Sequence, residues 1–249
     1  MFYTEPRLTV LARPQFVEPE HLGVAWLGEG TDGEKLAEFA GRICYMSQRN
    51  PAGRTTGEYL ENIKRQGHGS VLEHANYTLL LEGVSRSLTH ELVRHRAGFA
   101  FSQLSQRYVD ESEAHFVVPP AIVGEAALEA AWHAQVESAQ ASYVALVDQL
   151  MQRYAWVPDK VHRRKMAREA ARGVLPNSTE TKIVVTANAR AWRTALELRS
   201  SEAAELEIRR LAVTVIRLLK QETPHFFADF EVYQAEDRRE AARVGYRKV

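Results

Sequence analysis

Two short strings hold the residues best suited to chemistry. In the first, Arg94, His95 and Arg96 stand at the expected end of a helix that includes Leu92. Cations in the last turn of a helix complement its dipole, and Gly98 would suit a cap, so a structural role is as well supported as a binding role by this string alone. On a helix, Arg94 and Arg96 would point to nearly opposite sides, which would let the string contact two ligands.

The second string follows shortly after, at residues 102–108. Ser105 and Arg107 lie two positions apart, so their side chains share a face if the segment is extended. A hydroxyl beside a guanidinium group suits phosphate, because both donate hydrogen bonds and the arginine adds a positive charge. The spacing therefore predicts a phosphate-binding segment.

A third group of cations lies much further along the chain. Arg172 ends an expected basic helix, Arg190 follows Asn188 at the start of another helix, and Arg199 closes that helix. At about 100° per residue, Arg190 and Arg199 fall on opposite faces. Two arginines so placed would serve two ligands or two subunits, although their spacing alone favours a solvated helix face with ordinary caps.

A glycine pattern at residues 28–33 matches the G-x-G-x-x-G of dinucleotide-binding folds. Such a fold also needs a second strand that ends in an acidic residue about 20 positions later. Residues 47–55 are instead polar and interrupted by proline, without an acid. Glu29 and Asp32 would also repel phosphate. The pattern therefore predicts an acidic surface turn.

Two further candidates are weaker. His68, Glu73 and His74 do not have the spacing of a zinc helix or of a compact chelate, so we expect no metal site. Cys44 is the only cysteine and lies on an apolar helix face, where we expect a buried, inert thiol.

The composition limits the class of protein. The 249 residues fit one domain, and 45% hydrophobic with 26% charged residues is ordinary for a globular chain. Lys plus Arg and Asp plus Glu both number 32, and a net charge of zero argues against a dedicated nucleic-acid binder. A single cysteine allows no intrachain disulfide and suits a reducing cytoplasm. Residues 1–14 lack the long apolar core of a signal peptide, so none is expected there, and no apolar run reaches membrane-spanning length.

Hydrophobic periodicity predicts strands and long helices without regular alternation, which indicates an α/β protein of the α+β type. The chain is expected to form a single domain over 1–249, with a charged, peripheral tail at about 236–249. Strands are expected at 7–11, 74–81, 116–118 and 181–186, and helices at 35–47, 57–66, 88 to about 95, 126–154, 160–173, 189–198 and 202–221.

The strings together resemble the signature of flavin-dependent thymidylate synthases. Arg94-His95-Arg96, a spacer and Ser105-Gln106-Arg107 carry the resemblance. Further matching strings occur in the same order along most of the chain: Glu38 to Arg42, Gly67 to His74, Ala171 to Pro176, Asn188-Ala189-Arg190, and Arg199 with Glu207-Ile208-Arg209.

The resemblance implies a homotetramer with a mixed, largely antiparallel sheet, long flanking helices, and FAD bound between subunits. It implies conversion of dUMP to dTMP, with methylenetetrahydrofolate as carbon donor and NADPH as reductant through the flavin. No nucleic acid or membrane is an expected partner. A cytoplasmic location is expected.

The resemblance also assigns site residues. His68, Ser70, Arg94, His95, Arg96, Gln103, Asn188, Ala189 and Arg190 would contact FAD. Glu91, Arg94, Gln103, Ser105, Gln106, Arg107, Arg172 and Arg199 would hold dUMP, with Ser105 and Arg107 at its phosphate. No cysteine nucleophile is plausible, so Arg199 is the expected catalytic residue, because its cation can stabilise negative charge on the uracil ring.

The chain departs from the usual pattern at three points. Residues 97–104 make the spacer between Arg96 and Ser105 one residue longer than usual, and Ala97-Gly98 offers a place for a bulge. Thr194 and Ala203 replace longer polar residues that are common in the family, and both are left out of the predicted site.

Two other classes of function compete with the enzyme. A single-strand nucleic-acid binder would use the arginine clusters, with Phe101 and Tyr108 as stacking platforms. It does not explain the neutral total charge or the separate matching strings. An assembly protein would use the long helices only for packing.

Overall fold

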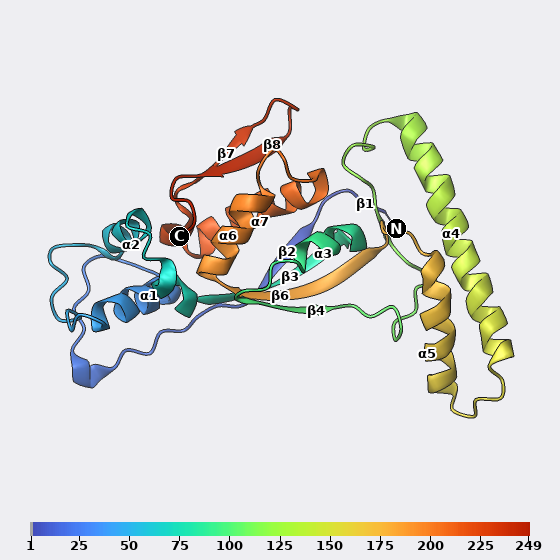
Figure 1. Cartoon of the computed structure of the whole chain (residues 1–249), viewed down its shortest axis with the longest axis horizontal. Helices are drawn as coiled ribbons and strands as arrows, with labels where there is room; N and C mark the ends of the chain where they lie inside the picture. The colour runs from blue at the N-terminus through green and yellow to red at the C-terminus, as the bar shows by residue number, and fades with distance from the viewer. Residues whose placement is uncertain (1) are drawn as a thin grey trace. The chain divides into compact units, whose positions relative to one another are not determined.

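A four-stranded sheet connects the segments that carry the candidate site. Its strands follow the order β2 (Arg7–Ala12), β3 (Asn76–Ser85), β6 (Glu180–Asn188) and β4 (Phe99–Gln103) (Figure 1). Alternate residues of β6 are buried, from Thr181 to Ala187, as expected of a strand with β-branched residues at the core. The predicted strands at 7–11, 74–81 and 181–186 are confirmed. Strand β4 was not predicted, because residues 97–104 were interpreted only as the spacer between Arg96 and Ser105.

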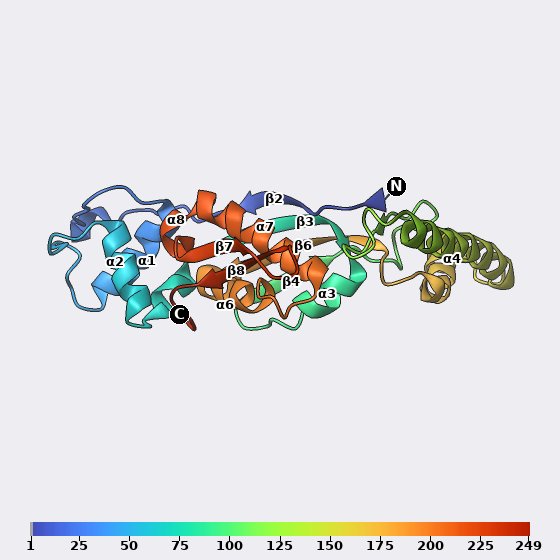
Figure 2. The same ribbon diagram turned by 90° about the horizontal axis from the view of Figure 1, so that it is seen from above.

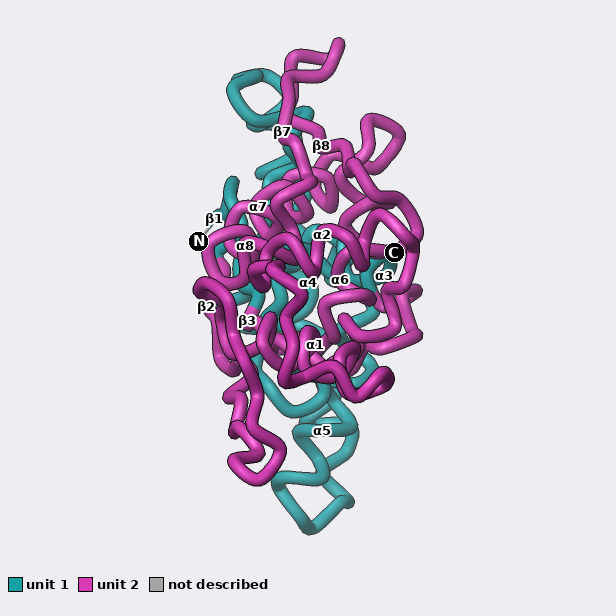
Figure 3. Tube along the Cα trace, turned by 90° about the vertical axis from the view of Figure 1, so that its left-hand side faces the viewer, with its two compact units in different colours: residues 1–7, 81–92, 102–183 teal, residues 8–80, 93–101, 184–249 magenta. Residues whose placement is uncertain are grey.

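Residues 2–249 are described by the computed structural model, and they fall into two compact units (Figure 3). Unit 1 comprises the residues up to Arg7 together with Leu81–Leu92 and Ser102–Ile183. Unit 2 comprises Leu8–Leu80, Val93–Phe101 and Val184–Val249. The strands of the sheet run from one unit into the other, so each unit is assembled from distant stretches of sequence.

Unit 1 contains a pair of long helices. Figure 1 shows α4 (Ala126–Arg153) and α5 (Lys160–Ala171) side by side and running in opposite directions. Only Val136 and Tyr143 of α4 are buried. The unit also contains α3 (Arg86–Leu92), the 3-10 helix η3 (Arg172–Val174), and the short parallel pair β1 (Phe2–Tyr3) and β5 (Phe116–Val117).

Unit 2 contains the other helices and an antiparallel hairpin. Its helices are α1 (Asp32–Ile43), α2 (Thr56–Arg65), α6 (Ala189–Arg199), α7 (Leu206–Glu222) and α8 (Pro224–Phe227), with 3-10 helices η1 (Glu20–Leu22) and η2 (Gly69–His74). The hairpin pairs β7 (Phe230–Gln234) with β8 (Glu240–Val244), and β8 packs against α6 and α7 (Figure 2).

Side-chain caps explain where several of these helices begin. Thr55 and Glu58 form a capping box at α2, with the Thr55 backbone N–H donating to Glu58 Oε2 at 2.8 Å. At α6, Asn188 Oδ1 accepts a hydrogen bond from the Ala191 backbone N–H at 2.8 Å. These helices and the strands confirm the predicted mixed α/β class.

The segment expected to be a peripheral tail is instead packed into unit 2. Ala241 and Ala242 of β8 are buried, and so is Val249. The Ala242 backbone N–H donates to the Ser200 carbonyl at 2.9 Å, which ties β8 to the end of α6. The prediction was wrong because charged residues at the hairpin surface obscured the small apolar residues between them.

Cys44 is exposed, so the prediction of a buried thiol was also wrong. The predicted apolar face of α1, which includes Phe39 and Ile43, is only half-buried, and the buried residues of the helix lie elsewhere on it, among them Ala37 and Gly41. Residues 24–27 form no strand, and α1 begins within the glycine pattern at 28–33, where residues 28–32 are exposed or half-buried, as expected of a surface turn. No helix within residues 2–249 is long and apolar enough to cross a bilayer.

Candidate functional site

The first arginine string lies in a loop, not on a helix. Helix α3 ends at Leu92, and the chain then turns through Gly98 into β4. Gly98 has φ +76°, and a Cβ placed there would lie 2.6 Å from Asn188 Nδ2 and 2.8 Å from Ala191 Cβ. The loop therefore closes tightly on the start of α6, and the helical geometry predicted for Arg94 and Arg96 was wrong.

Backbone hydrogen bonds fix the start of α6 against two neighbouring segments. The Asn188 N–H donates to the Gly98 carbonyl at 3.4 Å, and the Ala189 N–H donates to the Ala75 carbonyl at 2.8 Å. Ala189 itself is fully buried. The helix start, the loop at 93–98 and the end of η2 are thereby held together within unit 2.

A cavity of about 730 Å³ lies at this junction, within unit 2. Its size is that of a site for a cofactor or a drug-sized ligand. The lining residues are Glu73, Arg94, His95, Arg96, Ala97, Gly98, Phe99, Asn188, Arg190, Ala191, Thr194, Glu197, Leu198, Arg247 and Lys248.

The cations of this cavity differ in how they are paired. Arg190 Nη1 lies 2.6 Å from Glu73 Oε1. The guanidinium groups of Arg94 and Arg96 contact no acceptor within residues 2–249, so their charge is available to a ligand. A cavity with two such arginines is suited to an anion.

Arg199 lies at the far end of α6 from Arg190, as their spacing predicted. Arg199 Nε donates a hydrogen bond to His95 Nε2 at 3.0 Å. Burial lowers the pKa of His95, and the nearby Arg199 cation lowers it further. His95 is therefore neutral at pH 7, with Nε2 as the acceptor and its proton on Nδ1.

One wall of the cavity is aromatic. Phe99 packs edge-on against Trp192 with ring centroids 5.3 Å apart, and His95 lies 6.0 Å from Phe99. Phe99 also stacks on Phe101 at 5.5 Å. An aromatic wall beside a cationic rim suits a ligand that combines a flat ring with phosphate.

The second string lies in unit 1 and forms a turn. The Tyr108 backbone N–H donates to the Ser105 carbonyl at 3.1 Å, so the segment is not extended and the condition for a shared face is not met. Ser105 and Arg107 are still neighbours, because Ser105 Oγ accepts a hydrogen bond from the Arg107 backbone N–H at 3.4 Å. Arg107 Nε also donates to Glu169 Oε2 at 2.8 Å, in an exposed ion pair.

The other predicted residues of unit 1 lie on several elements. Gln103 Nε2 donates to Thr89 Oγ1 at 3.2 Å and to Thr181 Oγ1 at 3.3 Å. Gln106 is buried. Glu91 is half-buried on α3, and Arg172 is half-buried at the start of η3.

The structure thus brings together five predicted residues around one cavity: Arg94, His95, Arg96, Asn188 and Arg190. His68 and Ser70 are exposed on and beside η2 and do not line it. Four charged lining side chains were not predicted: Glu73, Glu197, Arg247 and Lys248. Thr194, which was set aside, does line the cavity, and its position four residues after Arg190 on α6 could have indicated this.

Comparison with known proteins identifies the family. Residues 27–225 match the family described as thymidylate synthase complementing protein, so the chain belongs to that family. The match includes the loop at 93–98, the turn at 105–108 and all of α6.

Curated relatives have a more particular name. A protein of Mycobacterium marinum named flavin-dependent thymidylate synthase is 46% identical over 238 residues, which cover 95% of this chain and 94% of the relative. A protein of Mycobacterium sp. (strain JLS) with the same name is 47% identical over 242 residues, with the same coverage. The Mycobacterium tuberculosis protein of this name is 46% identical over 238 residues.

Proposed function

We propose that the chain is a flavin-dependent thymidylate synthase. It converts dUMP to dTMP with methylenetetrahydrofolate as carbon donor, NADPH as reductant and FAD as cofactor. The observation that carries this proposal is the 46–47% identity, over 95% of the chain, to proteins of that name.

The cavity of unit 2 supports the binding of FAD. A dinucleotide needs an aromatic surface and cations for its diphosphate, and the cavity has Phe99, His95, and the unpaired guanidinium groups of Arg94 and Arg96. Asn188 and Arg190 extend this surface at the start of α6. Bound FAD would carry reducing equivalents from NADPH to the one-carbon unit, while the protein orients the rings.

The turn at 105–108 would hold the phosphate of dUMP. Ser105 and Arg107 supply a hydroxyl and a guanidinium group on the same turn. The Glu169 carboxylate is exposed, so Arg107 can exchange this ion pair for a phosphate at little cost. Arg107 therefore contributes mainly to nucleotide affinity, with Arg172, Glu91, Gln103 and Gln106 as further dUMP-binding residues.

The uracil ring must be activated without a thiolate. Cys44 is the only cysteine in the sequence, and its thiol donates to the Ala40 carbonyl at 3.3 Å on the outside of α1. Arg199 performs the activation instead, because its permanent cation stabilises negative charge on the N3–C4=O edge of uracil. Its Nε donates to Nε2 of the neutral His95 at 3.0 Å, which orients the guanidinium group.

A homotetramer in the cytoplasm completes the proposal. Several large apolar side chains are exposed, among them Leu128 on α4, Trp156 in the turn after α4, and Val161 on α5. Subunit contacts in a tetramer would cover such side chains. Light scattering of the purified protein would give a mass four times that of the chain.

A coupled assay tests the activity. Purified protein should bind FAD with a shifted flavin spectrum, oxidise NADPH only when dUMP is present, and form dTMP that carries the carbon of labelled methylenetetrahydrofolate. A colourless protein that cannot be reconstituted with FAD, and that binds single-stranded DNA, would contradict the proposal.

A further inference from the structure

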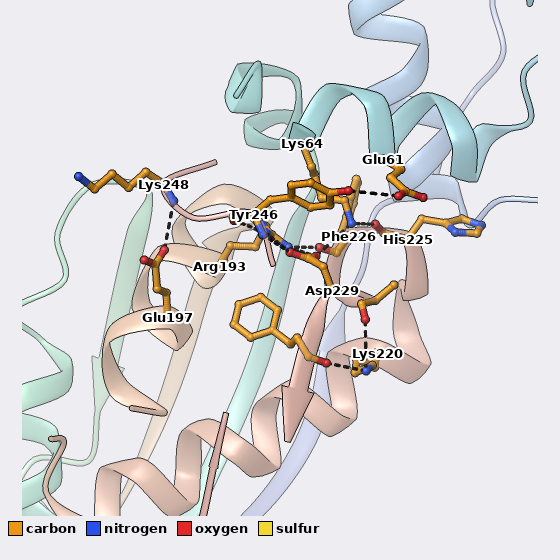
Figure 4. Close-up of polar contacts among 12 residues, drawn as sticks. Glu61, Lys64, Arg193, Glu197, Lys220, His225, Phe226, Asp229, Tyr246 and Lys248 are labelled. Carbon is orange, nitrogen blue, oxygen red and sulfur yellow. Dashed lines mark hydrogen bonds and ion pairs between the residues drawn. The ribbon is translucent and has the colours of Figure 1, made fainter. Parts of the chain in front are cut away.

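The cavity of unit 2 is completed by a segment far from every string considered above. We call residues 246–249 the strap. A buried ion cluster anchors its first residue (Figure 4). Arg193 Nη1 and Nη2 bind the two oxygens of Asp229 at 2.7 and 2.8 Å, and Lys64 Nζ lies 3.0 Å from Asp229 Oδ1. The side chains of these three residues are at most 9% exposed.

This cluster holds the strap through its backbone. Arg193 Nη2 donates to the Tyr246 carbonyl at 2.8 Å, and the Tyr246 N–H donates to Asp229 Oδ2 at 3.1 Å. At the other end, Val249 is buried against η2, where a Cβ on Gly69 would lie 2.5 Å from the Val249 carbonyl carbon. The path of the strap is therefore fixed at both ends.

Between these ends the strap contributes two cations to the cavity. Arg247 Nε donates to Glu197 Oε1 at 2.8 Å. The Lys248 backbone N–H donates to Glu197 Oε2 at 3.1 Å (Figure 4). Glu197 accepts from the backbone N–H of Lys248, not from its side chain. The ammonium group of Lys248 contacts no acceptor within residues 2–249.

The cavity as a whole carries excess positive charge. Five permanently charged cations line it, against the two carboxylates Glu73 and Glu197. We propose that Arg247 and Lys248 bind the diphosphate of a dinucleotide in this cavity, in addition to the arginines of the 93–98 loop. The inference rests on the proposed function, which supplies two dinucleotides, FAD and NADPH.

The residue types favour a diphosphate over a single carboxylate. Arg247 presents a fork that fits two phosphate oxygens, and Lys248 adds a point charge on a flexible stem. The side chain of Arg247 is 73% exposed, so Arg247 can exchange its ion pair with Glu197 for a contact with phosphate at little cost. Glu197 then limits the affinity, since its carboxylate stays close to the bound phosphates.

A double substitution tests the two cations. In R247A/K248A, we expect the dissociation constant of FAD for flavin-free protein to rise about 10- to 100-fold, with the dUMP dissociation constant unchanged. The matched control is Arg243→Ala, which removes an exposed cation of β8 that does not line the cavity. Its FAD affinity should equal that of the wild type.

A second variant guards against misfolding. Glu197→Gln keeps a hydrogen-bond acceptor for the strap and removes the competing charge, so FAD should bind several-fold more tightly. Loss of structure cannot produce a gain in affinity. If FAD affinity is unchanged in both variants but the NADPH KM changes in the same directions, the diphosphate is that of NADPH.

Two outcomes would overturn the proposal, and they are distinguishable. If wild-type protein binds FAD and turns over, but both variants keep its FAD affinity and NADPH KM, the strap does not bind diphosphate and the proposed function stands. If the wild type binds neither dinucleotide, the proposed function fails together with the inference.

Discussion

Arg199 donates a hydrogen bond from Nε to Nε2 of His95, at 3.0 Å, within unit 2. The bond joins the end of α6 to the loop that carries Arg94 and Arg96. It requires a neutral imidazole, because Nε2 can accept only when it carries no proton. The residue proposed to activate uracil is thus oriented by a residue proposed to contact the flavin.

Arg199→Ala should abolish most turnover at saturating dUMP. Loss of one charge-stabilising donor in an active site lowers kcat by about 10²- to 10³-fold. Arg199→Lys keeps the charge but not the fork, so it should recover part of kcat. Steady-state kinetics at several dUMP concentrations measure both effects. Near-normal kcat in Arg199→Ala would show that Arg199 serves only binding or packing.

His95 should make stability depend on pH. Its pKa in the folded protein is lowered from 6.5, so the folded state binds fewer protons than the unfolded state just below that value. The free energy of unfolding should therefore fall as the pH drops below about 6.5. His95→Gln can still accept from Arg199 but does not titrate.

The difference in unfolding free energy between wild type and His95→Gln isolates this histidine. Denaturant titrations at pH 5 to 8 should show the wild type losing stability relative to the variant on the acid side. Parallel curves over the whole range would mean that His95 titrates normally.

Glu111 should have the opposite dependence. Burial raises its pKa to about 7, with Glu180 and Asp110 adding to the effect and Arg86 opposing it. The folded state then binds more protons between pH 4.5 and 7, so stability falls as the pH rises through this range. As the pH rises from 4.5 to 8, the free energy of unfolding of Glu111→Gln should rise relative to that of wild type by on the order of 3 kcal/mol.

Thermal melts of the two proteins across this range measure the gain. Glu113→Gln, at an exposed position two residues away, is the matched control and should melt in parallel with wild type at every pH. A pH-independent difference between Glu111→Gln and wild type would contradict the raised pKa.

Asp229 should be among the residues most important for stability. Burial alone would raise its pKa, but the hydrogen bonds and charge of Arg193, with Lys64, lower it to about 2. Asp229→Asn leaves two buried cations without their counter-charge, which should cost on the order of 3–5 kcal/mol. In wild type, this contribution should be lost as the pH falls from about 4 towards 2.

Urea denaturation of Asp229→Asn measures the loss. Glu240→Gln removes one partner of the exposed pair with Arg217, and should change stability by less than about 1 kcal/mol. Equal effects of the two substitutions would show that the buried cluster contributes no more than a surface pair.

Local patterns predicted most elements but not the turns between them. Helices such as α6 have both hydrophobic periodicity and a capping residue, so the positions of Asn188 and Arg190 at the start of this helix were predicted correctly. The geometry of Arg94 depends on Gly98, whose left-handed conformation follows from its close approach to Asn188, a contact across 90 positions that no local pattern encodes.

The strap was missed for a related reason. Arg247 and Lys248 are ordinary surface cations in sequence, and only tertiary contacts such as those of the Arg193–Asp229 pair direct them to the cavity. Glu73 and Glu197 were not predicted either, because each is paired with an arginine that is distant in sequence. Cations paired through tertiary contacts leave no periodic signal.

The order in which the chain is synthesised gives the cavity a further property. Its lining begins at Glu73 and is complete only with Lys248, so nascent protein cannot present the whole site while residue 248 is still inside the ribosome. A ligand that requires every one of these side chains must therefore load after translation has passed this point, onto a chain whose other elements have already had time to form.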